Sequence, residues 1–148
     1  RLHTTFDPNA TGWQILTSNW ERNDTGFSVL GTGMTQSSGV FTFPSTGIYS
    51  VKAFFSFVRR NTNSEYNGGR IYTTSDNNSS SSLAAISYSH MVDLAGAFCQ
   101  AQMEHIFDVT NTSTHKVYFQ YECYDDATLR GNTDRNKTYF KFIKLGDT

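Results

Sequence analysis

The chain of 148 residues is of the usual size for one domain, and its formal net charge is −1. Such a charge creates no overall field that attracts a polyanion, so nucleic acid is not expected as a partner. No apolar run reaches the roughly 20 residues that a helix needs to cross a bilayer, so membrane insertion is not expected either.

Short alternating or apolar runs separated by Gly, Asn, Ser and Asp fill the chain. No segment keeps a helical period for more than about two turns, so we predict almost no α-helix. In chain order, strands are expected at 12–16, 27–30, 39–44, 48–58, 70–74, 83–91, 97–109, 116–124 and 138–145. Their spacing indicates a sandwich or barrel formed by one domain over residues 1–148. Because the chain opens with Arg1, we expect this domain to be the C-terminal part of a longer chain.

The two faces of the predicted strands differ. In 116–124, apolar residues alternate with largely polar ones, which is typical of a sheet with one buried face. Strands 48–58 and 138–145 are apolar on both faces. A two-layer sandwich buries only one face of each sheet, so the second apolar face must be covered by something else. Self-association is the simplest cover, and we therefore predict that one sheet contacts other copies of the chain.

Two segments resemble a known family. The stretch 39–51, Gly-Val-Phe-Thr-Phe-Pro-Ser-Thr-Gly-Ile-Tyr-Ser-Val, resembles the signature of the globular head of complement subcomponent q and its tumour necrosis factor (TNF)-like relatives. The closing stretch 139–146, Tyr-Phe-Lys-Phe-Ile-Lys-Leu-Gly, resembles the last strand of that family. The polar loops and the phrase 31–35, Gly-Thr-Gly-Met-Thr, are similar to versions that bacteriophages encode.

The resemblance implies an all-β fold, a ten-stranded jelly-roll sandwich of two antiparallel sheets that assembles as a compact homotrimer. The sheet holding 48–58, 97–109 and 138–145 would pack around the three-fold axis. Both termini would lie at the base with the turns 76–82 and 111–115, and the loops 59–69, 92–96 and 125–137 would gather at the far tip. The trimer interface would then include Ile48, Phe54, Val58, Phe98, Ile106, Phe140 and Phe142.

No pattern of catalytic residues is found. The four histidines are scattered, and no zinc-binding spacing, nucleophile elbow or phosphate-binding loop occurs. Cys99 and Cys123 fall on apolar faces, where two buried thiols are favoured over a disulfide bridge. We therefore expect no enzyme and no resident cofactor.

Calcium is the one metal for which the sequence offers a candidate site. Asp125, Asp126 and Asp134 lie in one predicted loop, and Ca²⁺ is bound by clustered oxygens. A solvated polar loop is the favoured alternative, since Arg130 and Arg135 lie among the acids and can pair with them.

Taken with the resemblance, these features indicate a non-enzymatic trimeric head of a virion or surface fibre, from a bacteriophage, located on the virion surface or outside a cell. Such a head would bind a cell-surface receptor or glycan through its apical loops. The expected contact residues are Arg59, Arg60, Asn61, Asn63, Tyr66, Asn67, Asp125, Asp126, Arg130, Asp134 and Arg135. Two alternatives stay open: a purely structural trimerisation or capsid-decoration domain, and a secreted complement-like or cytokine-like ligand.

Overall fold

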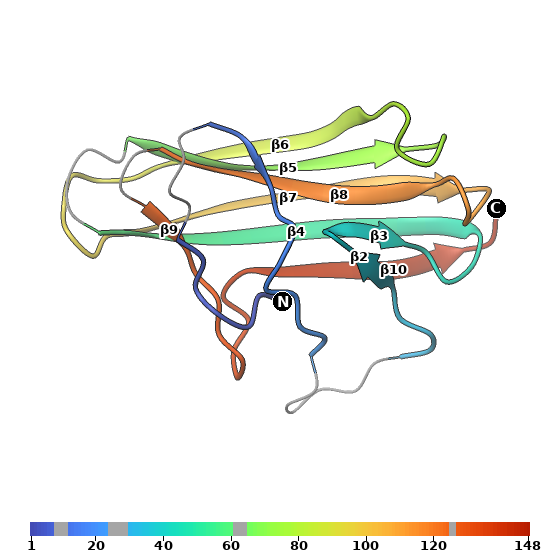
Figure 1. Cartoon of the computed structure of the whole chain (residues 1–148), viewed down its shortest axis with the longest axis horizontal. Helices are drawn as coiled ribbons and strands as arrows, with labels where there is room; N and C mark the ends of the chain where they lie inside the picture. The colour runs from blue at the N-terminus through green and yellow to red at the C-terminus, as the bar shows by residue number, and fades with distance from the viewer. Residues whose placement is uncertain (8–11, 24–29, 61–64, 125–126) are drawn as a thin grey trace.

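The computed structural model describes residues 1–7, 12–23, 30–60, 65–124 and 127–148, and these form two antiparallel sheets packed face to face (Figure 1). One sheet has the strand order β2-β3-β8-β5-β6, with β1 beside β8. The other has the order β10-β4-β7, with β9 beside the end of β4. The all-β prediction is confirmed, and no described residue belongs to a helix that is long and apolar enough to cross a membrane.

The ten strands agree with the predicted ones along most of the chain. They are β1 (Gln14–Ile15), β2 (Thr35–Ser37), β3 (Val40–Thr42), β4 (Gly47–Arg59), β5 (Tyr66–Thr74), β6 (Ser82–His90), β7 (Phe98–Val109), β8 (Lys116–Cys123), β9 (Ala127–Leu129) and β10 (Tyr139–Gly146). Strands β2 and β9 were not predicted, and β5 begins four residues before the predicted start. Most of the predicted strand 27–30 lies outside the described residues.

Aromatic side chains from both sheets form the core. Phe119 of β8 is fully buried, and its ring centroid lies 4.2 Å from that of Phe140 in β10. Phe55 of β4 crosses the sandwich to Gly69 of β5, where a Cβ atom would lie 2.4 Å from the Phe55 ring. Glycine is required at this position because the ring lies directly against the β5 backbone.

The register of β10 corrects one prediction. Phe140 pairs with Ala53 and Phe142 pairs with Val51, so both rings lie on the inner face of their sheet. There they pack against the core aromatic residues Phe41, Phe43, Phe55 and Phe119. The expectation that Phe140 and Phe142 lie on the outward face is therefore wrong. Both faces of β10 carry apolar residues, so the sequence pattern alone does not show which face is buried.

The two ends of the sandwich carry different turns (Figure 1). At one end, here called the distal end, β4 finishes, β5 begins, β6 finishes and β7 begins; Arg59 donates its N–H to the Ala97 carbonyl there. At the other end, the turns after β5 and β7 meet, where Asn77 donates its N–H to the Thr114 carbonyl. The C-terminus lies at that second end, as expected for the base, but Arg1 lies near the middle of the molecule (Figure 1). The prediction that both termini lie at the base is therefore wrong for the N-terminus.

Candidate binding surfaces

The distal end is held together by Arg59, which the sequence presented as an exposed contact residue. Its side chain is buried, with 2% of the residue exposed. Nη1 donates to the Val92 carbonyl oxygen at 2.7 Å, and Nη2 forms an ion pair with Asp93. Arg59 thus fixes the 92–96 loop to the end of β4, and the prediction that it contacts a receptor is wrong.

Asn67 is also a structural residue. It is fully buried on the inner face of β5, and its Nδ2 donates to the Cys99 Sγ at 3.6 Å. Its predicted contact role is therefore wrong, because alternate residues of a strand point to opposite faces and Asn67 points inward.

Other predicted contact residues do lie at the distal surface. Arg60 is exposed and forms an ion pair with Asp7. Tyr66 is half-buried, and its ring stacks on that of Tyr124 at a centroid distance of 5.0 Å. Asn61, Asn63, Asp125 and Asp126 lie outside the described residues.

Strand β9 divides the predicted loop 125–137 into two parts. Ala127, Thr128 and Leu129 are all buried, and they pair with the end of β4. Beyond them, Asp134 and Arg135 are exposed in a segment tied to the start of the chain, where Asn132 donates its N–H to the Leu2 carbonyl. Asp134 is thus separated by a buried strand from the sequence positions of Asp125 and Asp126. In the described part of the chain, no three His, Cys, Asp or Glu side chains form a group suited to a metal ion.

Two apolar side chains at the distal end were not predicted as contact residues. Val92 and Leu94 are both exposed in the 92–96 loop, which Arg59 holds in place. A rigidly anchored loop that presents apolar side chains to solvent is a common form of contact surface. The sequence signal was the pair of apolar residues within a segment otherwise typical of a turn.

The outward face of the β10-β4-β7 sheet is rich in apolar side chains, and we call it the β4 face. Phe98 is 59% exposed and Ile106 is 52% exposed, both on β7. Phe54 of β4 stacks on Tyr139 of β10, with ring centroids 5.2 Å apart. By the register of the three strands, this face also includes the apolar residues Ile48, Val58 and Ile143. Arg130, predicted as an apical contact, lies over the Phe98 ring at 4.3 Å.

The polar side chains in the middle of the β4 face bond to one another. Ser50 Oγ donates to Glu104 Oε1 at 2.5 Å, and Lys52 Nζ lies 3.7 Å from Glu104 Oε2. The hydrogen bond from Ser50 and, to a smaller extent, the charge of Lys52 lower the pKa of Glu104. This face therefore combines exposed apolar area with three central polar side chains that already have partners.

Burial shifts the pKa of three titratable residues inside the sandwich. Cys99 and Cys123 are free thiols, and both are buried. Burial raises the pKa of both thiols, so neither is an activated nucleophile. Burial lowers the pKa of His105, which lies half-buried on the inner face beside Phe107.

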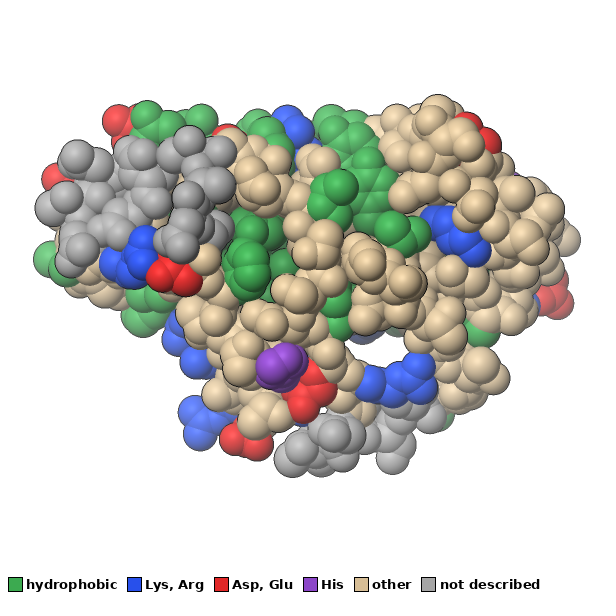
Figure 2. Space-filling view, in the orientation of Figure 1, with side chains coloured by type: hydrophobic (Ala, Val, Ile, Leu, Met, Phe, Trp, Pro, Cys, Tyr) green, Lys and Arg blue, Asp and Glu red, His purple; other side chains and the backbone are tan. Residues whose placement is uncertain are grey.

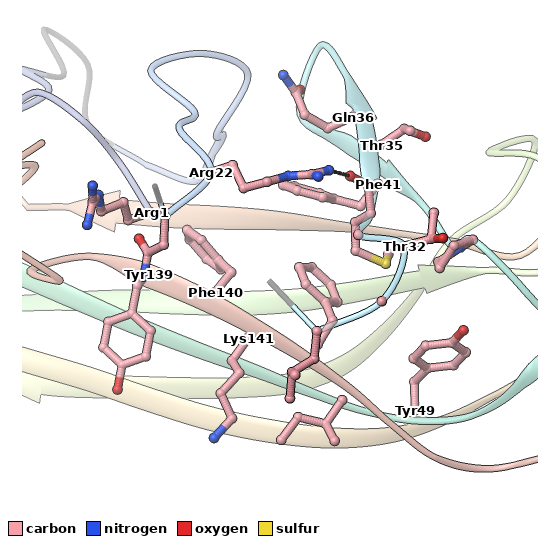
Figure 3. Close-up of a pocket in the computed structure, with 18 of the residues that line it drawn as sticks. Arg1, Arg22, Thr32, Thr35, Gln36, Phe41, Tyr49, Tyr139, Phe140 and Lys141 are labelled. Atoms are coloured by element: carbon pink, nitrogen blue, oxygen red, sulfur yellow. Dashed lines mark hydrogen bonds between the residues drawn. The ribbon is translucent and has the colours of Figure 1, made fainter. Parts of the chain in front are cut away.

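A hollow of about 1190 Å³ lies beside the free edge of β10, which pairs with β4 on its other side (Figure 3). Phe140 and Phe142 line it together with residues 30–36, and Arg22 Nη2 donates to the Met34 carbonyl oxygen at 2.9 Å across its rim. Figure 3 shows Tyr139 and Lys141 pointing to the opposite side of β10 from Phe140. No pattern in the sequence predicted this hollow.

Comparison with known proteins finds no match to the sequence but several structures with a similar fold. No protein-family model and no curated protein sequence matches the chain. The structure of Eiger TNF from S. frugiperda is similar with a TM-score of 0.60 at 11% identity, covering 78% of this chain and 70% of that chain. Murine APRIL at pH 8.0 is similar with a TM-score of 0.57 at 13% identity, covering 88% of this chain and 95% of that chain. Identities this low show the fold alone, and the chain thus has a TNF-like jelly-roll fold.

Proposed function

We propose that this domain is the non-enzymatic head of a virion or surface fibre, that three copies associate through the β4 face, and that the distal end binds a receptor or glycan on a cell surface. The observation that carries the proposal is the outward display of Phe98 and Ile106 on a sheet whose other face already forms the core. The phage-like character of the polar loops is the reason for preferring a virion fibre as the parent structure.

Association through the β4 face is favoured by its chemistry. Burying its apolar side chains lowers the free energy by roughly 25 cal/mol per Å² of apolar surface removed from water. Because Ser50, Lys52 and Glu104 bond to one another, covering them leaves none of these three groups without a partner. Three copies are proposed because residues 39–51 resemble the signature of heads that assemble as trimers.

The distal end suits a binding role because its loops are fixed to the sandwich. In a trimer, Arg60, Val92 and Leu94 would each be presented three times, so weak contacts gain by avidity. The buried thiols with raised pKa support a non-enzymatic role, since the sandwich then offers no thiolate for catalysis.

Sedimentation equilibrium at micromolar concentration tests the assembly. We expect the wild-type chain to have three times the 16.7 kDa mass of one copy. Phe98→Asp places a charge on the β4 face and should give monomers with an unchanged circular dichroism spectrum. Leu94→Asp is the matched control, because it makes the same change at an exposed apolar residue of the distal end, and it should remain trimeric. A wild-type chain that stays folded and monomeric contradicts the proposal.

A cell-binding assay tests the distal end separately. Arg60→Ala combined with Leu94→Ser should weaken attachment of the trimer to its host cells while leaving its mass unchanged. A trimer that attaches to no cell surface and no glycan supports instead a purely structural trimerisation or decoration domain. Attachment that is unaffected by the double change contradicts a contact role for these two side chains.

A further inference from the structure

The outward face of the β5–β6–β8 sheet carries a connected group of four rings, Trp13, Tyr88, Tyr66 and Tyr124, which we call the aromatic surface. Neighbouring ring centroids are 5.7 Å apart for Trp13 and Tyr88, 5.8 Å for Tyr88 and Tyr66, and 5.0 Å for Tyr66 and Tyr124. Tyr88 is 51% exposed, and the other three residues are half-buried. Figure 2 shows hydrophobic side chains exposed to solvent over β5, β6 and β8.

Gly68 of β5 makes this arrangement possible. A Cβ atom at this position would lie 2.9 Å from both the Trp13 ring and the Tyr88 ring. The two rings therefore meet above bare backbone, in space that any side chain would occupy. This close approach brings Trp13, from the segment before β1, over the middle of a sheet formed by distant parts of the sequence.

Three polar groups lie among these rings without a hydrogen-bond partner among the described residues. The Arg70 guanidinium carbon lies 3.6 Å from the Trp13 ring centroid, and its Nε is buried and unpaired. Gln120 of β8 lies opposite Arg70, and its Oε1 is buried and unpaired. Glu122 lies opposite Gly68, is 8% exposed, and forms no ion pair or hydrogen bond with another described residue.

The carboxylate of Glu122 is close to the rings. Glu122 pairs with Gly68, two residues from Tyr66 along β5, and its charge is the largest cause of the raised pKa of Tyr66. Burial raises the pKa of Glu122 itself, and the charge of Arg70 acts in the opposite direction. The aromatic surface thus surrounds one donor and two acceptors that water or a ligand must satisfy.

We infer that the aromatic surface binds the neutral hexose units of a glycan. The carbon-bound hydrogens of a pyranose ring pack on aromatic faces, and its hydroxyl groups both donate and accept hydrogen bonds. Those hydroxyls match the Arg70 donor and the Gln120 and Glu122 acceptors on the same surface. The inference rests on the proposed binding function, supplies a ligand class, and adds a glycan site on the side of the sandwich to the contacts of the distal end.

The charge balance favours a neutral sugar over an organic cation. Aromatic side chains around a carboxylate also bind quaternary ammonium groups. Here, however, Arg70 already lies over the Trp13 ring, where a ligand cation would bind, and it offsets the charge of Glu122. An uncharged ligand with hydroxyl groups is the better match.

The two indole N–H signals in a proton–nitrogen NMR spectrum of ¹⁵N-labelled protein test the inference. The probes are a panel of neutral hexose oligosaccharides and, separately, tetramethylammonium. We expect an oligosaccharide to shift the Trp13 signal, while the signal of Trp20, which is half-buried and packs against Phe41 and Phe140 instead of the four rings, stays in place. Trp13→Ala and Glu122→Gln should each weaken sugar binding about tenfold or more. Tyr72→Ala is the matched control, because Tyr72 stacks on Tyr118 of the same sheet without contacting the four rings, and it should bind as the wild type does.

Each other outcome overturns a defined part of the account. If tetramethylammonium shifts the Trp13 signal and no sugar does, the ligand class is wrong. Attachment to cells that survives Trp13→Ala but fails in the Arg60 and Leu94 double variant overturns this site while the proposed function stands. A trimer that binds neither cells nor sugars overturns both.

Discussion

The two sheets of this sandwich share one core but present outward faces of different chemistry. On the β4 face, Phe98 and Ile106 are exposed, and the central polar groups bond to one another. On the aromatic surface, Tyr88 is exposed to a similar degree, but Arg70 and Gln120 have buried polar atoms without a partner. Two faces with similarly exposed apolar side chains can therefore suit different kinds of partner.

The state of the polar groups separates the two faces. On the β4 face, Ser50, Lys52 and Glu104 bond to one another, and the exposed Gln100, Gln102 and Lys141 can pair with polar groups of a protein partner. On the aromatic surface, Arg70 Nε and Gln120 Oε1 are already buried without a partner, and a purely apolar cover would also bury the Glu122 carboxylate unsatisfied, so a ligand with its own hydrogen-bonding groups is the better match. The difference predicts a second protein copy on one face and a hydroxyl-rich ligand on the other.

The largest effect is expected from the core that supports both faces. Phe119 contacts aromatic residues of both sheets and is fully buried. Phe119→Ala should lower the free energy of unfolding by about 3–5 kcal/mol, because it removes apolar contacts and leaves a cavity. Chemical denaturation measures this loss, and Phe119→Leu, which leaves a much smaller void, should cost distinctly less. Equal losses for the two variants would show that this ring does not hold the sheets together.

A matched pair of changes separates the two faces directly. Ile106 is 52% exposed on the β4 face, and Tyr88 is 51% exposed on the aromatic surface. Ile106→Asp should convert trimers into monomers while each monomer still binds sugar. Tyr88→Asp should leave the mass trimeric and weaken sugar binding about tenfold or more. Mass measurement and sugar titration on both variants check this, and a single variant that changes both readouts would show that the faces are not independent.

A smaller effect is expected from Gly68→Ala. The added methyl group would lie 2.9 Å from Trp13 and Tyr88, so both rings must move apart. Sugar binding should weaken about tenfold, whereas the unfolding free energy should change by no more than about 1 kcal/mol. Gly146→Ala is the control, because a Cβ atom there meets no other atom within 4 Å. Unchanged sugar binding in Gly68→Ala would mean that the contact between the rings is not part of the site.

Alternation along the sequence predicted the long strands but not every face. The apolar side of strand β8 is buried as expected, but Lys116, Tyr118 and Glu122 on the side expected to face solvent are buried as well. Strand β10 is apolar on both sides, so only its register with β4 shows that Phe142 shares a face with Val51. Strand β9 has three residues, too few for any period to be read, and its burial comes from pairing with the end of β4.

The candidate sites were harder to predict because they depend on contacts between distant segments. Arg59 was expected to be exposed because arginine is usually found at the surface, yet its guanidinium bonds the 92–96 loop and is buried. The aromatic surface combines Trp13, Tyr88 and Tyr124 from three separate parts of the chain over Gly68. No local pattern brings these residues together; the strand order does.

The smallest expected effect is a difference in pH dependence between two glutamates, one on each face. The pKa of Glu104 is lowered in the folded chain, chiefly by the Ser50 hydrogen bond, so its contribution to stability is present above its unfolded pKa. That contribution is lost as pH falls through the folded pKa. The pKa of Glu122 is raised by burial, so stability instead falls as pH rises from the unfolded pKa through the folded one.

Denaturation between pH 3 and 7 compares Glu104→Gln and Glu122→Gln with the wild type. At neutral pH, Glu104→Gln should be less stable than the wild type, because it loses an ionised group that the fold favours. Glu122→Gln should be more stable there, because it removes a charge that burial disfavours, and both differences should shrink toward acid pH. A bound sugar should reduce the gain from Glu122→Gln, since its hydroxyl groups would satisfy the buried carboxylate. If sugar leaves that gain unchanged, Glu122 does not face the ligand.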